Sequence, residues 1–379
     1  MRFVSAQPAP LQAEPPAPAA RSRWPHALAA PLVSPSPTAM RGIALIGVVA
    51  SAAIIWTGGA VRLSQSGLGC TTWPKCTSAS LVASGATGDP LIHRWVEFGN
   101  RLITGAIFVI AIAVFVAAWR YRDGDRRRRD LVWLASAQPA GIVAQAVIGG
   151  IVVLTKLAPF WVSLHFIATL PVLAAAVALY VRCAESAGPA RPLAQPLARL
   201  TALALLAVTA VMMVIGTLVT GTGPLAGAAD TPRYRFLSLT QVTQLHADVG
   251  WVLGTLAVMT VLTLHLTGAP ARAFRFGWVA LGLIGLQGAL GYAQYFAHLP
   301  AGLVWVHVAN SALIWIAVLM LNFALRDRGK AGVPPDGAPV REGATAGSDG
   351  AASLPGGAAS LPDGAALPGT PLPGTAEVR

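Results

Sequence analysis

The sequence predicts an all-α integral membrane protein in which eight transmembrane helices form two duplicated four-helix bundles. Hydrophobic residues make up 55% of the 379 residues and charged residues only 11%, whereas about a quarter of the residues of an ordinary soluble domain are charged. Eight segments are apolar over the roughly 20 residues that a helix needs to cross a bilayer. Polar residues recur at matching places in the two halves, which indicates the duplication.

The first four segments make up the first half of the membrane part, residues 42–182. The second segment ends at an arginine-rich connection, Arg120–Arg129, and the third and fourth are separated by a short connection whose only basic residue is Lys156. We expect helices over residues 42–63, 93–119, 131–153 and 159–181.

The second half, residues 199–325, follows a linker at residues 183–198. Its first two segments are separated by the connection 221–238, and its last two by a short loop that contains His298. We expect helices over residues 199–220, 239–266, 276–297 and 302–325.

Basic residues predict the orientation of the helices. The Arg120–Arg129 connection holds six arginines, and basic residues collect in cytoplasmic loops. By alternation, both chain termini are then cytoplasmic, and the protein is expected to be a multi-pass protein of the cell membrane. Topology and anionic membrane lipid explain the net charge of +12, so no nucleic-acid partner is expected.

The two ends of the chain are predicted to lie outside the fold. Residues 1–41 are rich in Pro and Ala, and residues 326–379 are rich in Gly, Ala, Pro and Ser, compositions that cannot bury a core. We expect two disordered cytoplasmic tails. A cleaved signal peptide is not expected, because the first apolar stretch begins near residue 42 and is too long for one; Met40 is an alternative start.

Cys70 and Cys76 lie close together in the first long connection, which the predicted topology places outside the cytoplasm. Disulfides persist in that compartment, so we expect a Cys70–Cys76 bridge. Two free thiols are the alternative, and a metal pair is disfavoured because no third ligand is near. Cys183, at the inner end of the fourth segment, is expected to be an inert thiol.

A repeated pattern of glutamine and histidine carries the chemistry. Gln145 and His165 are twenty residues apart, Gln287 and His307 are also twenty apart, and His246 lies at a matching depth in the sixth segment. Histidines inside a membrane segment are costly and are functional candidates by default. The alternative is a histidine that hydrogen-bonds to a neighbouring helix for packing, which three residues at one depth make less attractive.

His246 and His307 are predicted to face each other in the second half. Two neutral imidazoles on facing helices can ligate a haem iron from both sides, so we expect these to be axial haem ligands. No role is assigned to His26, His265 or His298. Small residues that would let helices approach a flat ligand are Gly250, Gly254, Gly288 and Gly291.

The first half carries a different set of polar residues. His93, Glu97 and Asn100 follow one another at i, i+4 and i+7 and therefore line one helix face. A carboxylate on that face, near Arg101, indicates an active site rather than a site of electron transfer alone. The alternative is a structural ion pair between Glu97 and Arg101, also at i, i+4.

These residues together resemble the haem A synthase family over residues 42–325. The motifs that carry the resemblance are Thr57-Gly-Gly-Ala-Val-Arg62-Leu, Ser66-Gly-Leu-Gly-Cys70, Trp73-Pro74 with Cys76, Glu97-x-x-Asn-Arg101, Gln145-x-x-x-Gly149-Gly, His165, His246 and His307. The resemblance implies oxidation of a methyl group of haem O to a formyl group, which gives haem A for terminal cytochrome c oxidase.

The same resemblance implies how the residues divide. Haem b would be the cofactor, held between His246 and His307. Haem O would enter the first half, with His165 as an axial ligand and Glu97 and Arg101 as catalytic residues near the reacting methyl group. Haem O synthase and cytochrome oxidase assembly factors are the implied protein partners, and membrane lipid surrounds the chain.

One departure from the family pattern concerns the substrate iron. The family commonly has Glu-x-x-His-Arg on the second span, and this chain has Asn100 in place of that histidine. A carboxamide does not replace an imidazole as a strong iron ligand. Either His165 alone holds the substrate iron or His93 substitutes, although His93 lies about 10 Å further out at 1.5 Å per residue. The connection 221–238 also lacks the second cysteine pair that some members carry.

Two other classes of function stay open at this stage. A di-haem b-type quinone oxidoreductase also places paired histidines on facing helices, but it needs two such pairs. A transporter also uses a duplicated bundle with polar residues near the midplane, whereas the polar residues here cluster toward the outer end.

Overall fold

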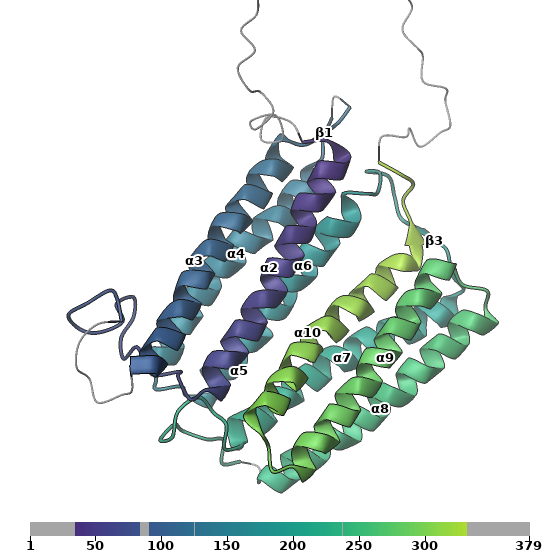
Figure 1. Cartoon of the computed structure of the whole chain (residues 1–379). Helices are drawn as coiled ribbons and strands as arrows, with labels where there is room; N and C mark the ends of the chain where they lie inside the picture. The colour runs from purple at the N-terminus through teal and green to yellow at the C-terminus, as the bar shows by residue number, and fades with distance from the viewer. Residues whose placement is uncertain (1–34, 84–90, 125, 237, 332–379) are drawn as a thin grey trace, which may run out of the picture. The chain divides into compact units, whose positions relative to one another are not determined.

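The computed structural model describes residues 35–83, 91–124, 126–236 and 238–331, and the predictions for the tails, at residues 1–34 and 332–379, lie outside these ranges. Among the described residues, eight helical spans are long and apolar enough to cross a membrane, which confirms the predicted all-α membrane fold. The helices (Figure 1) are α2 Pro37–Leu63, α3 Leu91–Arg120, α4 Arg129–Leu154, α5 Pro159–Ile167, α6 Thr169–Arg182, α7 Pro196–Thr222, α8 Leu239–Leu266, α9 Ala271–Phe296 and α10 Ala301–Ala324.

The helices pack in two closed rings of neighbours. In the first bundle α2 contacts α3 and α6, and α4 contacts α3, α5 and α6; in the second, α8 contacts α7 and α9, and α10 contacts α9 and α7. As a result, α3 lies diagonally opposite α5 and α6, and α8 lies diagonally opposite α10. Buried aliphatic side chains fill the second ring, among them Leu205, Leu253, Ile284 and Val318.

Tryptophans join the two bundles. The indole of Trp56 on α2 donates to the carbonyl of Ala309 on α10, at 3.1 Å, and the indole of Trp305 on α10 donates to the carbonyl of Trp56, at 2.8 Å. On the other side of α10, Trp315 donates to the carbonyl of Leu170 on α6 at 3.1 Å. Each bond ties a side chain of one bundle to the backbone of the other.

Most expected helix ends differ from the observed ones by a few residues, and the starts of α2 and α9, at Pro37 and Ala271, lie five residues earlier than expected. Helix α2 begins at Pro37, inside the expected tail, because Ser36 caps it by accepting the amide of Ala39 at 3.1 Å and proline is favoured at the first helical position. The fourth span is broken at Ala168 into α5 and α6. Pro171 explains the break, since it has no amide to donate to the carbonyl four residues before it.

The connections 121–128 and 183–195 and the segment after α10 lie at one end of the helices, here called the arginine-rich end. Short antiparallel strands order them: β1 (Arg122–Asp123) pairs with β2 (Arg126–Arg127), and β3 (Arg191–Pro192) pairs with β4 (Arg326–Asp327). The β3–β4 pair belongs to residues that were expected to be a linker and a tail, so the fold extends beyond both predicted boundaries.

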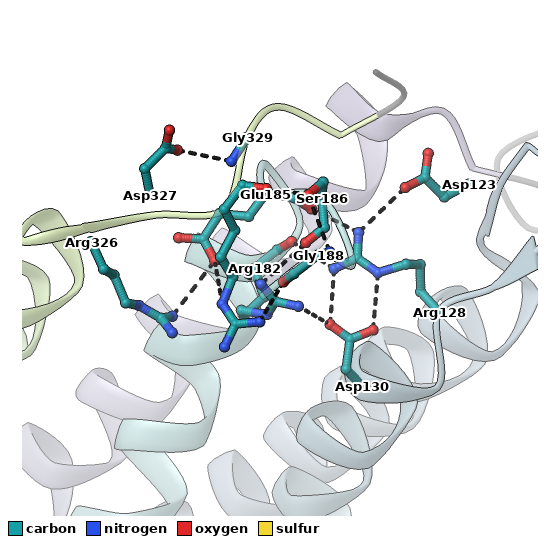
Figure 2. A network of polar contacts seen from close by, with 11 residues as sticks. Asp123, Arg128, Asp130, Arg182, Glu185, Ser186, Gly188, Arg326, Asp327 and Gly329 are labelled. Carbon is teal, nitrogen blue, oxygen red and sulfur yellow. Dashed lines mark hydrogen bonds and ion pairs between the residues drawn. The ribbon is translucent and has the colours of Figure 1, made fainter. Parts of the chain in front are cut away.

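A network of ion pairs connects these segments (Figure 2). The carboxylate of Asp130 accepts from Arg128 at 2.8 and 2.9 Å and from Arg182 at 2.6 Å, and Arg182 also pairs with Glu185 at 2.9 Å. Glu185 lies 3.5 Å from Arg326, which follows α10. The network therefore holds α4, α6 and the end of α10 together.

At this end, burial and the neighbouring charges shift the pKa of Arg128 in opposite directions. Burial opposes the charge of Arg128, but the adjacent carboxylate of Asp130 outweighs it and raises the pKa of the guanidinium. Burial raises the pKa of the Cys183 thiol to about 12. The thiol is therefore neutral at physiological pH, and a neutral thiol is a poor nucleophile.

We expect Arg182→Gln to lower the free energy of unfolding by roughly 2 kcal/mol. Removing one partner of a buried ion pair costs about 3–5 kcal/mol, and the effect is smaller here because Asp130 and Glu185 keep partial access to water. Thermal unfolding of the purified protein in detergent measures the change. Arg199→Gln, which removes an exposed arginine from the same end, is the control; equal unfolding temperatures for the two variants would contradict the role of the network.

Candidate functional site

His165 and His307 occupy equivalent depths on α5 and α10. His165 lies 17 residues before Arg182, where α6 ends, and His307 lies 17 residues before Ala324, where α10 ends. Counted along α4 and α9, Gln145 and Gln287 each lie 16 residues after the first helical residue. The two bundles thus place the same pair of residue types at the same level.

Each glutamine holds the backbone of its histidine. The amide of Gln145 donates to the carbonyl of His165, and that of Gln287 donates to the carbonyl of His307, both at 3.0 Å. In the second bundle Asn310 completes the arrangement by donating to the Oε1 of Gln287 at 2.8 Å. The corresponding Oε1 of Gln145 is buried without a hydrogen-bond partner. These bonds fix the level of each histidine relative to the neighbouring helix.

His246 and His307 face each other across the second bundle, with ring centroids 6.2 Å apart and ring planes at 52°. A metal lies about 2 Å from each of two ligating imidazole nitrogens, which separates the ring centres by roughly 6 Å. The pair therefore fits an iron between the two rings. Among the described residues no group of three His, Cys, Asp or Glu side chains could hold a metal ion.

The Nδ1 atoms of the three histidine rings have no hydrogen-bond partner among the described residues. In His165, His246 and His307 alike, this ring nitrogen is buried. A histidine kept for packing would bond through its ring to a neighbouring helix. At Nδ1, none of the three described histidines makes such a bond.

Glycines make room beside the same rings. A Cβ added to Gly149 would lie 3.3 Å from the Cε1 of His165, and one added to Gly216 or Gly291 would lie 3.5 Å from the Cε1 of His246 or His307. Of the four glycines singled out in the sequence, only Gly291 lies beside an imidazole. Gly216 was missed, because a glycine within an apolar run carries no signal of what it faces.

In the first bundle, the polar face of α3 contacts the connection between α2 and α3. The Nδ1 of His93 lies 2.8 Å from the Oγ of Ser66, and the amide of Cys70 donates to the Oε2 of Glu97 at 2.7 Å. The other oxygen of Glu97 pairs with Arg101 at 2.7 Å. The structural ion pair that was weighed as an alternative is therefore present, with both carboxylate oxygens occupied.

Residues 64–82 form a cross-linked cover over this end of the first bundle, here called the disulfide loop. The expected bond between Cys70 and Cys76 is present. Arg101 donates to the carbonyls of Thr72 and Lys75, each at 3.2 Å. The ring of Trp73 lies against α4, where a Cβ on Gly150 would come within 2.7 Å of it. Contacts with α3 and α4 thus hold the loop in place.

Asn100 is the one member of the α3 face without such a contact. Its Oδ1 is buried and has no hydrogen-bond partner. A ring contact is recorded between His246 and His307, whereas none is recorded among the described residues between His165 and another imidazole. Within the described ranges, the structure therefore brings together one histidine pair, and His165 has no ring contact with another imidazole.

Comparison with known proteins places these residues in a family context. Residues 41–319 match the sequence model of the cytochrome oxidase assembly protein family COX15-CtaA. Three similar curated proteins are named heme A synthase. That of Lysinibacillus sphaericus is 33% identical over 128 residues, which is 34% of this chain and 39% of the relative.

Two of these matches extend over most of both chains. The relative from Rhodopseudomonas palustris is 27% identical over 328 residues, 73% of this chain and 89% of its own length. The relative from Shewanella oneidensis is 22% identical over 317 residues, 72% of this chain and 92% of its own length. The match with the Lysinibacillus protein, by contrast, spans only about two fifths of that relative.

We expect Arg101→Gln to loosen the disulfide loop, because it removes the ion pair with Glu97 and the donors to Thr72 and Lys75. Hydrogen bonds from a charged group contribute about 1.5–3 kcal/mol each, so amide hydrogen exchange in residues 64–82 should accelerate by roughly tenfold or more. Exchange measured by mass spectrometry tests this.

The matched control is Lys75→Gln, which removes an exposed charge from the loop itself. Exchange in Arg101→Gln no faster than in this control would show that the loop is held by other contacts.

Proposed function

The chain belongs to the COX15-CtaA family of cytochrome oxidase assembly proteins, and from this premise we propose that it is a haem A synthase. It would oxidise a methyl group of haem O to a formyl group, making haem A for terminal cytochrome c oxidase. The observation that carries the proposal is the facing pair His246 and His307 in one bundle, with His165 at the matching depth of the other.

The second bundle is proposed to hold haem b. His246 and His307 would hold it, and Gly216 and Gly291 leave room for their imidazole rings beside the neighbouring helices. Haem b, when bound, supplies one-electron redox chemistry. The protein would contribute a fixed separation of the two imidazoles and an apolar surrounding.

The first bundle is proposed to bind the substrate haem O, with His165 as its axial ligand. Glu97 and Arg101 lie on α3, directly beneath the disulfide loop. A carboxylate offers about four lone-pair sites, and two of those on Glu97 are taken by Cys70 and Arg101. The remaining sites can stabilise positive charge that develops at the methyl carbon or accept a proton from it.

The disulfide loop has a distinct part in this proposal. The backbone amide of Cys70, which belongs to the loop, donates to the carboxylate of Glu97. The loop also covers the end of the first bundle. The carboxylate is thereby held in one place while the substrate binds. A covered site also excludes bulk water, which strengthens the electrostatic effect of a fixed charge.

A di-haem quinone oxidoreductase is disfavoured. Such a protein needs two axial histidine pairs, and within the described ranges only His246 and His307 are in ring contact. The polar face of α3 instead presents a carboxylate engaged with a loop, which is more useful for acting on a substrate than for holding a second permanent haem.

The proposed function predicts that the chain makes haem A when it is produced together with a haem O synthase in a host that lacks haem A. Glu97→Ala and His165→Ala should each reduce haem A to background while the low-spin haem of the second bundle is kept. Haem extraction and chromatography measure the product. Normal amounts of haem A from both variants would contradict the assignment of the substrate site.

In the same experiment His246→Ala and His307→Ala should lose the low-spin haem signal, because a site with two axial imidazoles has no third imidazole nearby to replace a lost one. The reduced-minus-oxidised spectrum of the purified variants measures this. An unchanged low-spin spectrum in both would place the resident iron elsewhere.

We further propose that the arginine-rich end is cytoplasmic, together with both chain termini, since basic loops are retained on that side. A reporter enzyme that is active only outside the cytoplasm should then work when fused after Val82 and fail when fused after Arg126. The reverse pattern would overturn the orientation and place the disulfide loop in a reducing compartment.

A further inference from the structure

We infer that the substrate iron in the first bundle has a single protein ligand, His165, and that its opposite coordination position lies open beside the carboxamide of Asn100. This inference rests on the proposed function, because it concerns the porphyrin that the first bundle would bind. It assigns the two bundles different coordination, closed in the second and open in the first.

Helix register makes Asn100 the counterpart of His246. Asn100 lies 20 residues before Arg120, where α3 ends, and His246 lies 20 residues before Leu266, where α8 ends. Helices α3 and α8 also hold the same place in their rings, diagonally across from the helix that carries the other histidine. A carboxamide thus stands where the second bundle has an axial imidazole.

The environment of Asn100 supports its place beside a bound group. Its Oδ1 is buried without a hydrogen-bond partner, and leaving a buried acceptor unpaired costs about 1–3 kcal/mol. A carboxamide is a weak ligand for haem iron, but its oxygen accepts hydrogen bonds, such as those that a bound water donates. Asn100 can therefore hold a small exchangeable ligand, such as water, at the open position without occupying it.

His93 is poorly placed to take the missing axial position. It lies seven residues before Asn100, about 10 Å further toward the disulfide loop at 1.5 Å per residue. The ring nitrogen Nδ1 is held by Ser66 at 2.8 Å, and its carbonyl is covered closely by Gly69 of the loop. The ends of helices are defined to within one or two residues. This margin is much smaller than the seven residues between His93 and Asn100, so it does not bring His93 to the level of the axial position.

Open coordination suits a substrate more than a resident cofactor. A porphyrin held by one imidazole exchanges more readily than one clamped from both sides, because only one iron–protein bond must break. The first bundle can then accept haem O and release its product, while the second keeps its haem.

The test uses the full-length chain purified from a host that makes haem O. The ferric protein should show a high-spin iron in addition to the low-spin iron of the second bundle, and carbon monoxide should bind one of the two reduced haems. Asn100→His should convert the high-spin signal to low-spin and reduce carbon monoxide binding at least tenfold. His93→Ala should leave both signals unchanged.

A second variant, with the opposite substitution in the second bundle, keeps the inference testable if Asn100→His does not fold. His246→Asn should open the second bundle, so that its iron becomes high-spin and binds carbon monoxide. Neither readout depends on haem A formation.

Two results would overturn the inference. The first is a protein that still makes haem A but holds two haems that are both low-spin and do not bind carbon monoxide. This result would overturn the open coordination alone, and loss of low-spin character in His93→Ala would then identify His93 as the ligand. A single bound haem and no haem A would overturn the proposed function and the inference together.

Discussion

Under the proposed function, the arrangement depends on one geometric constraint: two imidazoles on diagonally opposite helices must reach the same iron. Each residue of a helix advances about 1.5 Å and turns about 100°, so a shift of one residue in α8 relative to α10 would point a ring away from its partner. The observed separation of 6.2 Å between His246 and His307 therefore requires that the register of both helices be fixed. The bond from Gln287 to the carbonyl of His307, supported by Asn310, supplies part of that register.

In the first bundle the same kind of hydrogen bond holds the histidine, but the residues on α3 differ from those on α8. Gln145 holds His165 as Gln287 holds His307, but α3 presents Asn100 to the interior, and nearer its end it presents Glu97, which is bound to the disulfide loop. Under the proposed function, one bundle would hold a permanently bound group and the other an exchangeable one. At the opposite end, the ion pairs around Asp130 and Arg182 connect α4, α6 and the segment after α10. These ion pairs therefore join the first bundle to the segment that follows the second.

Much of this could be predicted from the sequence, since composition and apolar length determine membrane helices almost alone. The disulfide and the pairing of His246 with His307 followed from topology and depth. The contacts of the loops could not be predicted, because no sequence pattern tells which backbone amide will meet the carboxylate of Glu97 or which hydroxyl will meet His93. The pairing of β3 with β4 was missed for a similar reason: two residues on each side carry no periodic signal, and their order comes from the neighbouring ion pairs.

The most direct test of the account is an iron anomalous-difference map from crystals of the haem-loaded protein. We predict two iron positions, one about 2 Å from a ring nitrogen of each of His246 and His307 and one bonded to His165, with the side chain of Asn100 beyond bonding distance on its other face. An iron bonded to only one of His246 and His307, or one bonded to none of the three histidines, would contradict the account.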